Sequence, residues 1–246
     1  MITTASFLYV AQLMCDESIA EKKIDRSIPY TLTLSDYFHK VFLSAGGYFL
    51  EFDTNGNMKY DAFGLGRIHF EGAPSVICMS SPCSSTPNYK IDLSGAVDLS
   101  LAPGCFCDEA EKYIFATSKN SKHTLKELSS DENKAYASFD VTLENKKTLD
   151  AYYCTSSSGV SIKISGEGKI AHMLPAFYFD GKEHSEISCD EDTLEIKYQG
   201  WVCRYKTDGK IVNSGNVACN RNGHYKVFYA SGEGTLSVKV EILKAE

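Results

Sequence analysis

Arg67 and His69 have residue types and a spacing that could carry chemistry, and Tyr60 lies a few positions earlier in the chain. The residues around them form a strand-like pattern, and side chains two positions apart in a strand point to the same face. A cation beside a substrate carboxylate, together with a nearby base, is what removal of an adjacent proton requires. We therefore predict Arg67, His69 and Tyr60 as candidate catalytic residues. The alternative is an exposed Arg–His pair on the polar face of a strand.

A second candidate site is aromatic. Trp201, Tyr198 and Tyr205 fall on two neighbouring predicted strands. Flat aromatic rings of this kind give sugar rings a surface on which to stack, so we predict these three as ligand-binding residues. The alternative is that they pair across strands as ordinary packing residues.

The polar residues form no metal or cofactor motif. Asp53, Asn55 and Asn57 begin like a calcium loop, but Met58 stands where glycine is required and Gly64 where glutamate is required. The sequence also lacks the glycine-rich nucleotide loop, the zinc-protease helix and the serine-hydrolase elbow. We expect no metal and no cofactor.

The cysteines and the charge limit the partners. The chain has 246 residues, nine cysteines and a net charge of −7. The cysteine number is odd and the spacing irregular, which favours buried reduced thiols over zinc, with one or two disulfides as the alternative. No long basic run occurs, so we expect no nucleic acid partner.

The N-terminal segment is apolar but short. We predict a helix over residues 4–15, with almost no polar face, followed by a charged linker. It lacks a basic leader region and is too short to span a bilayer, so we expect neither a signal peptide nor a membrane partner. A secreted or periplasmic protein and a cytoplasmic one fit these residues equally well.

The remaining chain is typical of antiparallel β-structure. Strand patterns recur every few residues, separated by turns such as Asn55-Gly56-Asn57. We predict an all-β fold: a large two-sheet antiparallel sandwich, of supersandwich type, with short N-terminal helices at residues 4–15 and 36–44. The expected division is a helix and linker over residues 1–29 and a sandwich domain over residues 30–246.

Three segments carry a resemblance to a known family: GGYFLEFD, GLGRIHFEG and MLPAFYFDGKEHSEI. With the strands around them they resemble the C-terminal β-sandwich half of heparinase II/III-like polysaccharide lyases. In that family an N-terminal α/α toroid precedes the sandwich and supplies most of the catalytic residues. The resemblance implies a sandwich without its toroid, inactive as this chain alone, that binds polysaccharide or oligosaccharide containing uronate.

Two other functions remain open. One is a non-catalytic interaction module, in which the apolar helix over residues 4–15 packs in a homodimer or against a missing toroid domain. The other is a self-contained sugar-active enzyme on a β-supersandwich, which would need two carboxylates in one cleft.

Overall fold

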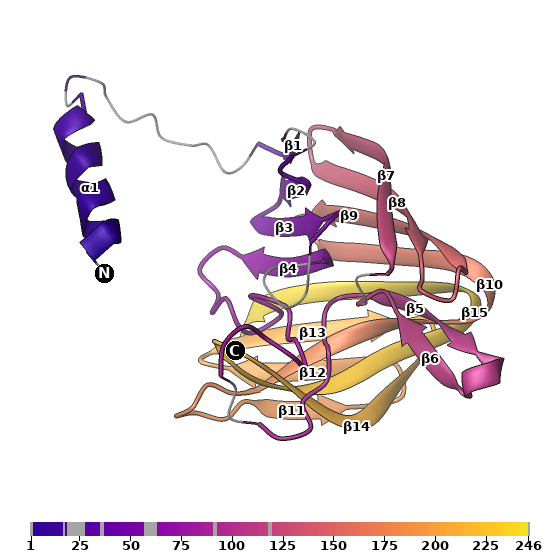
Figure 1. Cartoon of the computed structure of the whole chain (residues 1–246). Coiled ribbons are helices and arrows are strands. Elements are labelled where there is room, and N and C mark those ends of the chain that lie inside the picture. The colour runs from indigo at the N-terminus through magenta and orange to yellow at the C-terminus, as the bar shows by residue number, and fades with distance from the viewer. Residues whose placement is uncertain are drawn as a thin grey trace.

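The computed structural model describes residues 2–16, 18, 28–34, 37–56, 63–90, 93–117 and 120–245. Within these residues the chain forms a four-stranded sheet and an eleven-stranded sheet, both antiparallel (Figure 1). The small sheet has the order β1 (Tyr30–Thr33), β2 (Lys40–Ala45), β3 (Tyr48–Asp53) and β4 (Gly64–Phe70). The predicted all-β two-sheet sandwich is confirmed.

The large sheet contains all the later strands. These are β5 (Pro103–Cys107), β6 (Lys112–Phe115), β7 (Lys122–Ser130), β8 (Lys134–Thr142), β9 (Thr148–Ser156), β10 (Gly159–Phe179), β11 (Glu186–Cys189), β12 (Thr193–Tyr198), β13 (Trp201–Thr207), β14 (Lys210–Asn220) and β15 (Gly223–Lys244). Its main path runs β11-β12-β13-β15-β10-β9-β8-β7, with β14 paired to β15 and the β5–β6 hairpin paired to β10.

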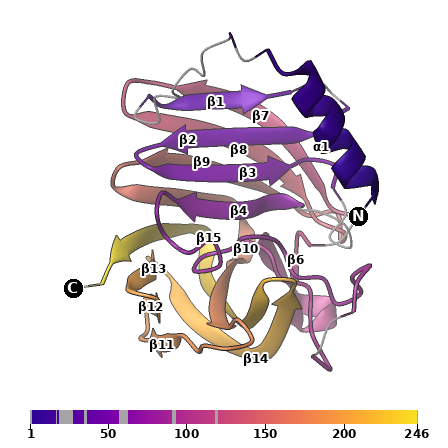
Figure 2. The same ribbon diagram turned by 90° about the vertical axis from the view of Figure 1, so that its left-hand side faces the viewer.

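The two sheets pack face to face through alternating apolar side chains. Along β2 and β3, the inward residues Leu43, Leu50 and Phe52 are fully buried. The Phe52 ring lies 5.0 Å from the ring of Phe139 on β8 and 4.8 Å from that of Tyr153 on β9. Figure 2 shows the small sheet in front with β7, β8 and β9 behind it. The period-two alternation of strands therefore builds the core between the sheets.

Residues 40–45 correct one sequence prediction. The helix predicted over residues 36–44 was wrong where the structure describes it, because Lys40–Ala45 is strand β2. Val41, Leu43 and Ala45 are buried at alternate positions, so the period is that of a strand and not of a helix. Gly46 and Gly47, with φ of +59° and +86°, form the tight turn that joins β2 to β3.

The N-terminal helix forms where it was predicted. Helix α1 (Ile2–Met14) stands apart from both sheets in Figure 1, and its side chains from residue 4 onward are exposed. No helix among the described residues is long and apolar enough to cross a membrane. A helix with exposed apolar side chains is compatible with the predicted packing partner. The identity of that partner stays a prediction.

The β2–β3 turn also fixes how the sheets dock. A Cβ atom on Gly46 would lie 2.0 Å from the backbone nitrogen of Ser157, in the turn between β9 and β10. We expect Gly46→Ala to lower the free energy of unfolding by more than about 2 kcal/mol, because it adds a backbone clash to the cost of a left-handed conformation. Urea unfolding measures this.

Gly215→Ala is the matched control. Gly215 also has positive φ, of +73°, but an added Cβ would meet nothing within 4 Å. Gly215→Ala should lower the free energy of unfolding by about 1–2 kcal/mol, which is the conformational cost alone. Equal losses in the two variants would show that the turn does not hold the sheets together.

Candidate functional site

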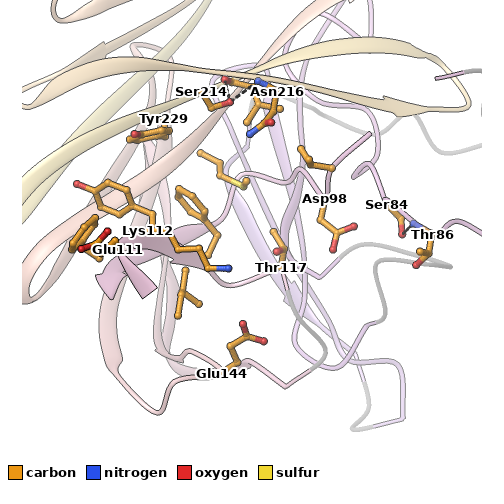
Figure 3. A pocket seen from close by; sticks show the side chains of 17 residues that line it. Ser84, Thr86, Asp98, Glu111, Lys112, Thr117, Glu144, Ser214, Asn216 and Tyr229 are labelled. Carbon is orange, nitrogen blue, oxygen red and sulfur yellow. Dashed lines mark hydrogen bonds between the residues drawn. The ribbon is translucent and has the colours of Figure 1, made fainter. Parts of the chain in front are cut away.

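A cleft of about 920 Å³ opens beside the second half of β10 and the first half of β15 (Figure 3). Five separate parts of the chain line it: the segment after Cys83, the β5–β6 hairpin, the loop after β8, strand β10, and the β14–β15 pair. The lining residues are Ser84, Thr86, Val97, Asp98, Phe106, Glu111, Lys112, Tyr113, Ile114, Phe115, Thr117, Glu144, Met173, Ser214, Asn216, Val227 and Tyr229. We call it the aromatic cleft. Its volume is that of a site for a small-molecule or oligosaccharide ligand.

One side of the aromatic cleft is a cluster of rings. The Tyr113 ring lies 5.1 Å from that of Tyr229 and 5.3 Å from that of Phe106, and Phe115 lies 6.0 Å from Tyr229. Burial raises the pKa of the Tyr229 hydroxyl, and the neighbouring Tyr113 raises it further. Tyr229 therefore stays neutral at physiological pH and keeps a hydroxyl that can donate a hydrogen bond.

Polar groups occupy the other side. Figure 3 shows the ammonium group of Lys112 and the carboxylates of Glu144 and Asp98 facing the same space. Asp98 accepts a hydrogen bond of 2.6 Å from the backbone N–H of Ser85, which fixes its orientation. Near Tyr229, Ser214 Oγ donates to the Val227 carbonyl at 2.7 Å. The cleft thus combines an apolar stacking surface with charged hydrogen-bonding groups.

Gly104 allows the β5–β6 hairpin to sit where it does. A Cβ there would lie 2.6 Å from the Ile114 carbonyl oxygen and 2.6 Å from a ring atom of Phe115. Strand β5 also pairs with β10 through Cys105 opposite Ile170. The close approach at glycine therefore holds Phe115 and Tyr113 against the main sheet.

Two of the predicted catalytic residues, Arg67 and His69, lie elsewhere, on the outer face of the small sheet. Arg67 and His69 point to the same face of β4, opposite Glu51 and Phe49 in the register. Arg67 Nη1 is 3.0 Å from Glu51 Oε2, so its charge is already balanced by a carboxylate. Tyr60 lies outside the described residues.

The ion pairs of this face continue beyond Arg67. Lys40 Nζ lies 3.0 Å from Glu51 Oε1 and 3.0 Å from Asp53 Oδ2, and all three side chains are largely buried. Burial lowers the pKa of His69, and the adjacent Arg67 lowers it further. His69 is therefore neutral near pH 7, as a base must be, and it lines a smaller cavity of about 360 Å³.

The predicted sugar-stacking residues do not form one surface. Tyr205 is fully buried, and its hydroxyl donates to the Pro175 carbonyl at 3.0 Å. Tyr198 is 5% exposed and donates to Asp180 Oδ2 at 2.7 Å. Trp201 is half-buried, with its ring 5.9 Å from the ring of Phe70. Another pair of partly exposed rings, Tyr113 and Tyr229, lies 5.1 Å apart in the aromatic cleft, and the role of Trp201, Tyr198 and Tyr205 in ligand binding stays a prediction.

In the part of the chain that the structure describes, no three His, Cys, Asp or Glu side chains are placed to hold a metal ion together. All nine cysteines are free thiols, and those at 78, 83, 105, 203 and 219 are buried.

Comparison with known proteins gives structural neighbours alone. No protein-family model and no curated protein sequence matches the chain. The crystal structure of heparan sulfate lyase HepC from Pedobacter heparinus is similar with a TM-score of 0.55 at 8% identity, over 99% of this chain and 42% of that one. Heparinase III, the BT4657 gene product, gives 0.53 at 10%, over 91% and 36%. The chain thus spans less than half of each lyase.

For a third solved structure, the match covers most of the length of both chains. HI1317 is similar with a TM-score of 0.51 at 11% identity, over 87% of this chain and 99% of that one. The neighbours show a shared β-sandwich fold and support a distant structural resemblance to heparinase-type lyases. HI1317 also shows that nearly a whole chain can consist of this fold.

Buried histidines yield a prediction of pH dependence. His123 on β7 packs edge-on against Phe63 with ring centroids 4.8 Å apart, and neither ring nitrogen has a hydrogen-bond partner among the described residues. Burial lowers the pKa of His123 from 6.5 to about 4. Above pH 6.5 the imidazole is neutral in both the folded and the unfolded state. Below that pH the unfolded chain takes up the proton first, so stability falls until the folded-state pKa is passed.

His123→Leu should remove this loss. Between neutral pH and about pH 4, the parent should lose about 3 kcal/mol more free energy of unfolding than the variant. Urea unfolding at both pH values measures the difference. Phe63→Leu is the control, since it removes the ring contact but keeps the proton-binding group, and should retain the parent's pH dependence. Identical pH dependence in parent and His123→Leu would contradict the assignment.

Proposed function

We propose that this chain is a carbohydrate-binding β-sandwich that holds a short segment of a uronate-containing glycan in the aromatic cleft. The observation that carries the proposal is the placement of Tyr113 and Tyr229 opposite Lys112, Asp98 and Glu144 around one cavity. The structural similarity to two polysaccharide lyases supports a link to polysaccharides at the level of fold.

Each group has a role in the proposed complex. The faces of Tyr113 and Tyr229 stack on the C–H faces of the sugar rings. Asp98 and Glu144 accept hydrogen bonds from sugar hydroxyls, and these bonds are strong because the acceptors are charged. The Lys112 ammonium pairs with the uronate carboxylate. One cation among several carboxylates suits a glycan with scattered acidic groups better than a densely charged one.

The proposal is binding without complete lyase chemistry. Elimination beside a uronate carboxylate needs a cation or hydrogen-bond donor on that carboxylate and a base for the adjacent proton. In the aromatic cleft Lys112 supplies the first group, but among the residues that the structure describes no histidine lines the cavity. Within this proposal Arg67, His69 and Tyr60 remain candidates for a partial site, whose substrate-facing side another domain would complete.

A second candidate function is an interaction module. The exposed apolar side chains of α1, such as Phe7, Leu8 and Leu13, favour it, because such a helix gains stability when a partner covers it. A concentration-dependent dimer that Leu8→Asp disrupts would support this function over glycan binding.

The test is calorimetric titration with xylotetraose that carries one glucuronate side group and with unsubstituted, neutral xylotetraose. We expect Tyr113→Ala to weaken binding of both ligands about tenfold, because stacking is lost. Lys112→Gln should weaken binding of the acidic ligand alone. Tyr37→Ala, which removes a highly exposed tyrosine far along the chain from the cleft residues, is the control and should bind like the parent.

Two results would contradict the proposal. Unchanged affinities in Tyr113→Ala and Lys112→Gln would exclude the aromatic cleft as the site. New absorbance from an unsaturated uronate product during the titration would show turnover and would overturn the non-catalytic assignment.

A further inference from the structure

A cluster of lysines lies on the outward face of the large sheet, on the other half of the β10–β15 pair. Lys163 on β10, Lys206 on β13 and Lys239 on β15 line a shallow cavity of about 520 Å³ together with the hydroxyl residues Ser161 and Ser237. The strands β9, β10, β15 and β13 are consecutive neighbours in the sheet (Figure 1). We call this surface the lysine face.

The register fixes how the charges are arranged. Lys206 lies directly opposite Lys239, and Lys239 lies opposite Ser161 on its other side. Lys163 lies opposite Ser237, one row away. With neighbouring strands about 4.8 Å apart, the three lysines surround the two serines within a patch of about 10 Å.

The charges on this face are unevenly balanced. Lys239 Nζ is 2.8 Å from Glu241 Oε1. Asp208 lines the same cavity, and its Oδ1 accepts a hydrogen bond of 2.8 Å from the Ser237 backbone N–H, so three lysines outnumber two carboxylates here. Lys163 and Lys206 are exposed and have no ion pair with any described carboxylate. Like charges directly opposite each other on a sheet are unfavourable, so the Lys206–Lys239 pair lowers stability when nothing anionic lies between them. In a chain of net charge −7, such a cationic patch reverses the local potential.

The neighbouring side chains indicate the kind of anion. Tyr152 on β9 lines the same cavity, its side chain is exposed, and it lies opposite Lys163 in the register. A ring face beside serine hydroxyls and ammonium groups suits a sugar ring that carries a sulfate or carboxylate. Three lysines are too few to follow a phosphodiester backbone. The aliphatic residues at this cavity, Ile162 and Val238, are buried, so the cavity does not offer the exposed apolar side chains that a membrane surface would require.

We propose that the lysine face is a second binding surface, which takes a sulfated or carboxylated glycan chain through Lys163, Lys206 and Lys239. The proposal goes beyond glycan binding in the aromatic cleft and does not require the cleft to be occupied. The negatively charged groups of the chain lie over Ser161 and Ser237 between the lysines, and one of its sugar rings lies on Tyr152.

The test compares a dextran sulfate oligosaccharide with neutral dextran of the same length, titrated into the full chain at low and moderate salt. The parent should bind the sulfated ligand alone, and more weakly as salt rises, because exposed charges are screened. The double variant Lys163→Gln/Lys206→Gln should bind it about tenfold more weakly, since two exposed ion pairs are lost.

Lys197→Gln is the matched control. Lys197 is an exposed lysine on the same outward face, on β12, opposite Glu186 in the register. Lys197→Gln removes one positive charge, as does each substitution in the double variant. It should leave the affinity for the sulfated ligand within about twofold of the parent. Thermal unfolding of the double variant should be unchanged or raised, because a repulsive pair is removed, so lost binding would not reflect lost folding.

Other results overturn the proposal in distinguishable ways. Sulfated-ligand binding that survives in the double variant but is lost in Tyr113→Ala would place all binding in the aromatic cleft, leaving the proposed function intact. Absence of binding in the parent, or equal affinity for single-stranded DNA, would exclude a glycan-binding lysine face. If inorganic sulfate competed at matched ionic strength with the same affinity as the dextran sulfate oligosaccharide, the sugar would add nothing to binding. That result would likewise exclude a glycan as the ligand of the lysine face.

Discussion

The pairing of β10 with β15 is the constraint on which the rest of the structure depends. Two strands of 21 and 22 residues pair from Val160 opposite Val240 to Phe179 opposite His224. A register shift between Ser165 and Lys169 divides this ladder into two halves. A slip of one residue in either half would move its apolar side chains to the opposite face, so the register decides which residues are buried.

The two halves have different neighbours and therefore different surfaces. The half next to β9 and β13 buries one face under the small sheet and exposes the lysine face on the other. The half next to β5 and β14 is covered in part by the segment between β4 and β5. In that segment the Val76 carbonyl accepts a hydrogen bond from the Tyr225 hydroxyl, and the Ala102 carbonyl accepts one from the Met173 N–H. The aromatic cleft is the uncovered remainder of that half.

This division separates two kinds of charge. The aromatic cleft carries Asp98, Glu111 and Glu144 with one lysine, whereas the cavity of the lysine face carries three lysines with Asp208. Weakly acidic and densely acidic saccharides would therefore prefer different surfaces of one sheet. The buried ion pairs of Lys40 and Glu51 on the small sheet have another consequence: they balance Arg67 and leave it poorly suited to act alone on a substrate carboxylate.

Local patterns predicted the fold better than the site. Alternation along residues 135–143 and 149–154 identified strands β8 and β9, and the same-face placement of Arg67 and His69 followed from strand geometry. The helix over residues 36–44 was wrong because Phe38, Val41 and Phe42 also fit a helical period, and the inward burial that decides between the periods is a tertiary property.

The aromatic cleft could not be found in the same way. Asp98, Tyr113, Glu144 and Tyr229 come from four distant segments, and only sheet order and register bring them together. The available signal was the alternation of Tyr113 and Phe115 after a turn, which by itself predicts a strand and no ligand. Tyr205, chosen from its type, is buried because its strand position faces the core.

Hydrogen–deuterium exchange with saturating xylotetraose that carries one glucuronate side group tests the central claim most directly, because it locates the bound glycan along the chain. The account predicts slower amide exchange in Pro103–Cys107, Lys112–Phe115 and Lys210–Asn220, the strands that carry or flank the aromatic cleft. Unchanged exchange in these strands, with protection confined to Gly64–Phe70, would contradict it and place the site at Arg67 and His69.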